Sequence, residues 1–134
     1  MTKFILFPFA LFFSLFLFQF TTSSQTNGKW EKLGTMTVNM KLDHDELMVT
    51  AKDGIFKAVK FNVASSPVKV ISIKIVFGNG QTELFKINKQ FAPGTESNIL
   101  DLPGNKRIIH KIVFNYVTKP NPKGKARISV WGKH

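Results

Sequence analysis

Cysteine is absent from this chain of 134 residues. Its absence excludes a disulfide scaffold, a zinc site with thiolate ligands, a cysteine nucleophile and a lipid anchor attached through cysteine. Acidic residues are also scarce, because 8 Asp and Glu stand against 19 Lys and Arg, which gives a net charge of +11. Such an excess favours acidic partners, although charge alone does not define a function.

A long hydrophobic run of the kind that spans a membrane is also missing. The longest apolar stretch covers residues 4–18, includes Pro8 and follows the basic Lys3, whereas a spanning helix needs about 20 residues. A basic tip, a short apolar stretch and small residues up to Ser24 are typical of a secretory signal. We therefore predict a signal peptide at 1–24, with a retained anchor as the alternative. The rest of the chain is expected to be exported, periplasmic or secreted, with no transmembrane span after cleavage.

The segment 25–134 contains no convincing amphipathic helix. Apolar and polar residues alternate along its whole length, and clusters of Gly, Pro, Asn and Ser separate the alternating stretches. Between Val70 and Ile71 the alternation slips by one residue, which predicts a β-bulge. The pattern predicts one all-β domain, a β-sandwich of about eight strands. A jelly roll is favoured, and an immunoglobulin-like sandwich or a small closed barrel are the alternatives.

Four short segments carry a resemblance to known proteins. They are WEKLG at 30–34, FAPG at 91–94, DLPGNKRII at 101–109 and VWGK at 130–133. Together they resemble a group of small exported bacterial β-domains of unknown function. The resemblance implies export and an all-β fold, and it implies neither an activity nor any catalytic residue.

Residues with catalytic or metal-binding potential are few. The cluster from Asp43 to Glu46 could supply oxygen ligands for Ca²⁺ or the two carboxylates of a hydrolase, but a polar turn between Leu42 and Leu47 explains it more simply. The three histidines are too far apart in sequence to indicate a zinc site, and no nucleophile or phosphate-binding motif occurs. We expect a protein that is not an enzyme and has no cofactor or metal. A small hydrolase that uses Asp43, Asp45 or Glu46 is the alternative.

The basic residues are concentrated toward the C-terminus. Two predicted strands and the loop between them carry Lys106, Arg107, Lys111, Lys119, Lys123, Lys125 and Arg127. Because consecutive strands often lie side by side, these residues are expected to form one basic face. Such a face would bind an anionic polysaccharide or another polyanion of the cell envelope, whereas nucleic acid is an unlikely partner for an exported protein. The alternative is a solvated surface without a ligand.

Two aromatic residues are candidates for stacking on sugar rings. Trp131 alternates in phase with Arg127 and Ser129, so it is expected to face away from the core, and Tyr116 is the second candidate. These features predict an exported, non-catalytic binding module for anionic or carbohydrate material of the envelope. The alternative is a structural or protein-interaction component with a protein partner and no small-molecule ligand. Its contact surface would include Phe56 and Ile71, which fall out of the alternation.

Overall fold

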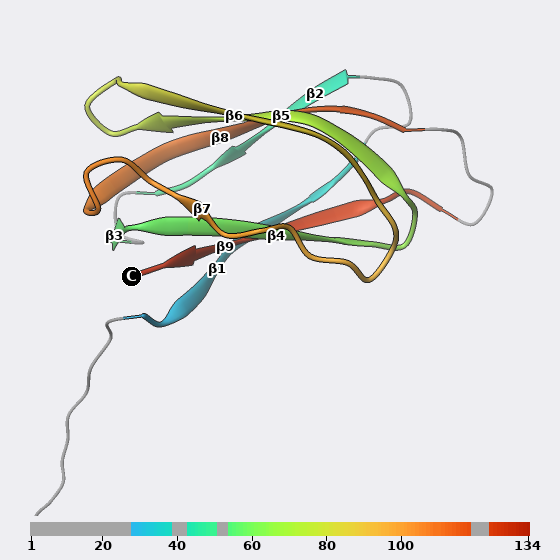
Figure 1. Cartoon of the computed structure of the whole chain (residues 1–134), viewed down its shortest axis with the longest axis horizontal. Coiled ribbons are helices and arrows are strands. Elements are labelled where there is room, and N and C mark those ends of the chain that lie inside the picture. The colour runs from blue at the N-terminus through green and yellow to red at the C-terminus, as the bar shows by residue number, and fades with distance from the viewer. Residues whose placement is uncertain (1–27, 39–42, 51–53, 119–123) are drawn as a thin grey trace, which may run out of the picture.

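The fold consists of two antiparallel β-sheets packed face to face (Figure 1). A computed structural model describes residues 28–38, 43–50, 54–118 and 124–134, so the predicted signal segment lies outside the described residues. Within these ranges no helix is long and apolar enough to cross a membrane. The strands are β1 (Trp30–Thr37), β2 (Asp43–Met48), β3 (Ile55–Phe56), β4 (Ala58–Ala64), β5 (Val68–Phe77), β6 (Thr82–Phe91), β7 (Leu100–Asp101), β8 (Arg107–Val117) and β9 (Arg127–Lys133).

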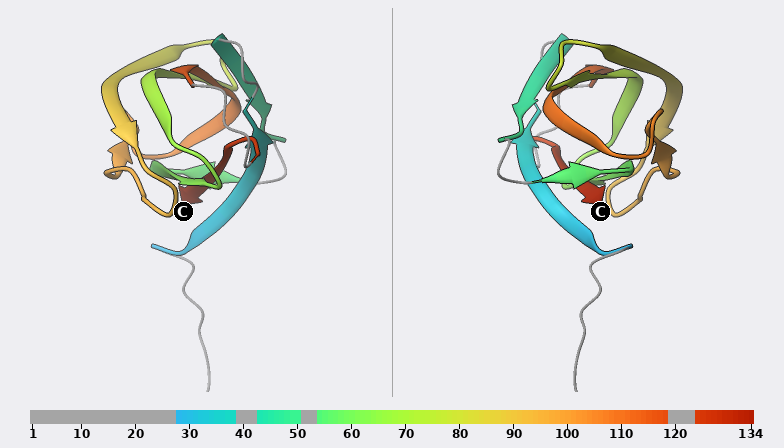
Figure 2. Two further views of the ribbon diagram at one scale, coloured as in Figure 1. Left: turned by 90° about the vertical axis from the view of Figure 1, so that its right-hand side faces the viewer. Right: turned by 90° about the vertical axis from the view of Figure 1, so that its left-hand side faces the viewer.

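The order of the strands is that of a jelly roll. The four-stranded sheet runs β1-β9-β4-β7, and the five-stranded sheet runs β2-β8-β5-β6 with β3 paired to β8. The antiparallel pairs are nested, because β1 pairs with β9, β2 with β8, β4 with β7 and β5 with β6. The chain therefore passes from one sheet to the other at most of its connections. Figure 2 shows the two layers from the ends of the sandwich. The predicted jelly-roll β-sandwich is confirmed.

Alternation along each strand separates the core from the two outer faces. In β4, Val59, Phe61 and Val63 are buried between the sheets, and the intervening residues face outward. The Phe61 ring packs edge-on against Phe91 of β6 and Phe114 of β8, with ring centroids 4.9 Å and 5.4 Å away. Both partners belong to the opposite sheet, so this aromatic contact connects the two layers through the centre of the core.

Three local expectations have clear outcomes. The bulge is confirmed, because the register of β5 against both of its neighbours shifts between Val70 and Ser72. The polar turn expected at Asp43–Glu46 is wrong, since these residues begin β2, which is paired with β8 and has alternate side chains in solvent. Phe56 is not available for a surface patch, because its side chain is fully buried. It fits there because Gly132, on the facing strand β9, has no side chain.

Substituting Gly132 tests this packing. A Cβ at this position would lie 2.6 Å from Phe56 Cδ1 and 3.2 Å from Leu33 Cδ1. Because the Phe56 ring is enclosed and also contacts the His134 ring at 4.6 Å, it has little room to move. Gly132→Ala is expected to lower the free energy of unfolding by about 1–3 kcal/mol, measured by urea denaturation.

The control is Ser129→Ala on the same strand. This side chain points outward and loses one exposed hydrogen bond to Thr35, so its cost should stay below about 1 kcal/mol. A Gly132→Ala variant as stable as the wild type would contradict the close packing of β9 on Phe56.

Candidate functional site

The described residues of the predicted basic face do not lie together. Strand β8 lies in the five-stranded sheet and β9 in the four-stranded sheet, so Lys106, Arg107 and Lys111 are separated from Lys125 and Arg127. The expectation that consecutive strands lie side by side fails here because a jelly roll sends the chain across to the other sheet between them. The two remaining members of the predicted face, Lys119 and Lys123, lie outside the described residues.

Two of the β8 cations already have protein partners. The Lys111 ammonium lies 3.4 Å from a carboxylate oxygen of Glu46. Arg107 donates to Gln81 Oε1 at 2.7 Å and to the Pro103 carbonyl at 3.0 Å, and its guanidinium carbon lies 3.8 Å from the centre of the Phe77 ring. Their neighbour Lys106 is exposed and forms no ion pair with a described residue.

Tyr116 cannot stack on a ligand from the surface. Its side chain is 2% exposed and points into the core in phase with Ile112 and Phe114. The hydroxyl lies 3.2 Å from Asp45 Oδ2 of the paired strand β2. The prediction of an exposed tyrosine is therefore wrong, and this phenol is a buried group that finds a polar partner at the edge of the core.

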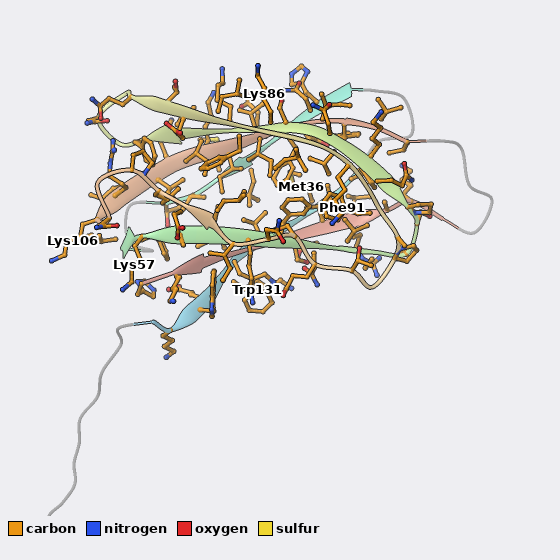
Figure 3. The ribbon with its side chains drawn as sticks, viewed as in Figure 1. Met36, Lys57, Lys86, Phe91, Lys106 and Trp131 are labelled. Atoms are coloured by element: carbon orange, nitrogen blue, oxygen red, sulfur yellow. The ribbon has the colours of Figure 1, made fainter. Side chains whose placement is uncertain are left out.

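Trp131 does face outward, and it has lysines on both sides. Its indole lies on the outer surface of the four-stranded sheet (Figure 3). In the register of this sheet Trp131 is opposite Lys32 of β1 and Lys60 of β4. The Lys32 ammonium lies 5.8 Å from the centre of the Trp131 ring. Trp131 is only partly buried, so part of the indole remains open to solvent.

A second tryptophan belongs to the same surface. Trp30 of β1 is opposite Lys133 of β9, and the ammonium groups of Lys60 and Lys133 lie 4.4 Å and 5.8 Å from the centre of its ring. These distances fall within the range of cation–π attraction. We name the surface formed by Trp30, Lys32, Lys60, Trp131 and Lys133 the Trp–Lys face.

Polar side chains and further charges border this face. The next row of the sheet contains Thr35, Ser129 and Asn62, with a hydrogen bond of 2.9 Å between the first two hydroxyls. Arg127 lies one row further on. Glu96 lies 3.3 Å from the Lys60 ammonium and offsets part of its charge. Lys32 and Lys133 form no ion pair with a described residue, so the face as a whole remains cationic.

Sequence reasoning identified Trp131 of the Trp–Lys face and Arg127, which borders it, and missed the three lysines of the face. Alternation predicts that Lys60 faces outward, because it lies between the buried Val59 and Phe61. It does not reveal which strands are neighbours, so the proximity of Lys60 to Trp30 and Trp131 could not be inferred. In β1 the register shifts between Lys32 and Gly34. Residues before and after this shift that face the same side of the sheet are therefore out of phase in the sequence.

Of the three carboxylates considered for a small hydrolase, Asp45 and Glu46 lie on opposite faces of β2, and the side chain of Asp43 lies outside the described residues. Asp45 faces the core side, where it lies against Tyr116, and Glu46 faces solvent, where it contacts Lys111. Strand geometry sends successive side chains to opposite faces, so these two carboxylates do not share a cleft. In the part of the chain that the structure describes, no three His, Asp or Glu side chains are grouped as metal ligands would be.

The chain belongs to a family defined as a domain of unknown function, DUF2541, which matches residues 9–132. This agrees with the resemblance to β-domains of unknown function. Neither the curated proteins nor the solved structures contain a significant match. The family assigns no activity, so the case for a function rests on the geometry of the site.

Asn62 provides a test of the polar row beside the Trp–Lys face. Its carbonyl oxygen Oδ1 is buried and has no hydrogen-bond partner among the described residues. An unsatisfied buried acceptor costs about 1–3 kcal/mol, and valine suits a strand better than asparagine. Asn62→Val is therefore expected to raise the free energy of unfolding by up to about 1 kcal/mol in urea denaturation.

Ser97 is the matched comparison. Its hydroxyl accepts a hydrogen bond from the Phe61 amide at 3.0 Å. Ser97→Ala leaves this amide without its acceptor and should lower the free energy of unfolding by about 1–2 kcal/mol. A loss of stability in Asn62→Val as large as in Ser97→Ala would show that the Asn62 oxygen is satisfied in solution.

Proposed function

We propose that this protein is an exported, non-catalytic binding module for anionic carbohydrate of the cell envelope, and that the Trp–Lys face is its binding surface. The observation that carries the proposal is the placement of two partly exposed indoles among three lysines on one outer sheet face. The export rests on the predicted signal peptide at 1–24, and the ligand would be met in the periplasm or outside the cell.

The chemistry of the surface suits a charged sugar polymer. An indole offers a flat apolar area against which the C–H groups of a sugar ring can pack. The lysines in contact with the rings supply charges for carboxylate, sulfate or phosphate groups on the same polymer. Trp30 and Trp131 lie on adjacent strands in neighbouring rows of the sheet, and the backbone positions of such diagonal neighbours are about 7–8 Å apart. Two rings that project from such positions can contact different sugar units of one chain.

The alternative is a protein-interaction role, and it would rest on the edge strand β6. This strand of 10 residues has one partner among the described strands, β5, so one side of it could pair with a strand of another protein. Two features oppose such pairing. Asn88 has a φ of 47° in the middle of the strand, which interrupts regular β-geometry, and exposed lysines such as Lys86 and Lys89 are typical of protected edges. The Trp–Lys face is therefore the better supported site.

Heparin, a linear sulfated polysaccharide, is a suitable probe. We expect the protein to be retained on a heparin column, and Lys32→Gln/Lys60→Gln/Lys133→Gln to elute at lower salt because three cations are removed from the face. Trp131→Ala is expected to weaken binding to a heparin oligosaccharide about tenfold, by analogy with the loss of one aromatic ring that stacks on a nucleobase. Calorimetry at two salt concentrations separates the two contributions, since the lysine term depends on ionic strength.

A control with the same change in net charge comes from the opposite side of the sandwich. Lys69, Lys74 and Lys86 are exposed on the five-stranded sheet, so their triple substitution by Gln removes as much charge without touching the Trp–Lys face. Equal loss of retention in both triple variants would contradict the proposal, because retention would then depend on overall charge. Full affinity of Trp131→Ala would contradict the stacking.

A further inference from the structure

One end of the sandwich contains a cleft that is separate from the Trp–Lys face. Its volume is about 640 Å³, within the range of about 300–1,000 Å³ that is usual for ligand sites. The lining includes Val49, Phe77 and Ile109 on the inner side, and Ile55 and Ile108 nearer to solvent. The latter two side chains are 50% and 44% exposed. Two isoleucines left this open beside a hollow give the cleft an exposed apolar wall.

The rim of the same cleft is cationic. Lys106 and Arg107 line it together with His110 and Asn79, and no Asp or Glu is among its described lining residues. Arg107 is held in place by Gln81 and Pro103, whereas Lys106 has no ion pair with a described residue. Lys57 stands beside Lys106 at this end (Figure 3), where Ile55 and Lys106 also line a second hollow of about 430 Å³. An occupant with a negative charge and an apolar body would match both parts of the surface.

The described backbone groups around the cleft are poorly placed to form hydrogen bonds with a peptide. The Val49 amide donates to the His110 carbonyl, and the Gly78 amide to the Ile108 carbonyl, at 2.9 Å and 2.8 Å. Strand β3 is paired with β8 at this point. These groups are therefore used within the fold, so recognition would depend on side chains. A second copy of the chain is disfavoured as well, because it would bring Lys106 and Arg107 against the same cations with no carboxylate among the described lining residues to face them.

We propose that this end cleft binds a single-chain amphipathic anion, namely a medium-chain fatty acid whose carboxylate lies at Lys106 and Arg107 and whose alkyl chain lies along Ile55 and Ile108. The charge of the rim selects the head group, and the exposed apolar wall accommodates the alkyl chain. This site is independent of the Trp–Lys face, since none of the residues that define that face is among the described lining residues of the cleft.

Calorimetry with a series of fatty acids tests the proposal directly. Hexanoate, octanoate and decanoate are titrated into the full chain below their micelle-forming concentrations. Affinity is expected to rise about fourfold for each methylene that enters the cleft. Decyltrimethylammonium, with the same chain and a positive head group, should bind at least about tenfold more weakly than decanoate, because it meets the cations of the rim.

Variants locate the binding. Ile108→Ser and Ile55→Ser each remove an exposed apolar wall and should weaken decanoate binding about tenfold, and Lys106→Glu should weaken it by reversing a charge at the rim. The matched controls are Leu84→Ser and Lys86→Glu on the outer face of the five-stranded sheet, where Leu84 is 51% exposed; both should bind as the wild type does. Thermal unfolding identifies a variant that has lost its fold. The two isoleucines are substituted separately, so if one variant does not fold, the other variant still tests the proposal.

Four results would overturn the proposal. The first is an affinity that does not increase with chain length. The second is equal binding of decanoate and decyltrimethylammonium, which would indicate an apolar contact without selection of the anion. The third is the same loss of binding in Leu84→Ser as in Ile108→Ser, which would indicate adsorption over the whole surface. Concentration-dependent dimerisation that is lost in Ile108→Ser, without decanoate binding, would assign the cleft to self-association instead.

Discussion

The contact of Phe61 with Phe91 and Phe114 is the interaction on which the rest of the molecule depends. It joins the two sheets at centroid distances of 4.9 Å and 5.4 Å, and alternation then sets the orientation of the positions next to these rings in their strands. Phe61 directed inward places Lys60 outward, beside Trp30. Because Phe114 points inward, Tyr116, two residues further along the strand, also points into the core. The same aromatic contact that stabilises the core therefore determines which cations are available to a ligand.

The jelly-roll topology explains why the binding features come from distant parts of the chain. Strand β9 lies between β1 and β4, so tryptophans near the two ends of the described chain meet on one sheet face. The same topology separates β8 from β9 and distributes the C-terminal cations between two places. Arg127 borders the Trp–Lys face, whereas Lys106 and Arg107 line the end cleft. One small sandwich thus presents a flat aromatic and cationic surface and, apart from it, a concave apolar surface with a cationic rim.

The fold class and several orientations could be predicted from the sequence, because alternation is a local property. The outward position of Trp131 and the bulge at Ile71 both follow from the phase of apolar residues within one strand. Partners between strands could not be predicted in this way, since pairing depends on topology. That is why the neighbours of Trp131 were missed and a basic face was expected across β8 and β9. Tyr116 was assigned to the surface for its chemistry, although its phase with Ile112 places it in the core.

The most direct test of the central claim uses the two tryptophans, the only ones in the sequence. Each indole N–H gives its own signal in a ¹H–¹⁵N NMR spectrum, and the signals of Trp30 and Trp131 can be assigned by substituting one residue at a time. Titration with a short heparin oligosaccharide should shift both indole signals together with the amides of β1 and β9, and leave the amides of β5 and β6 unchanged. Shifts at β5 and β6 with both indole signals unmoved would contradict binding at the Trp–Lys face.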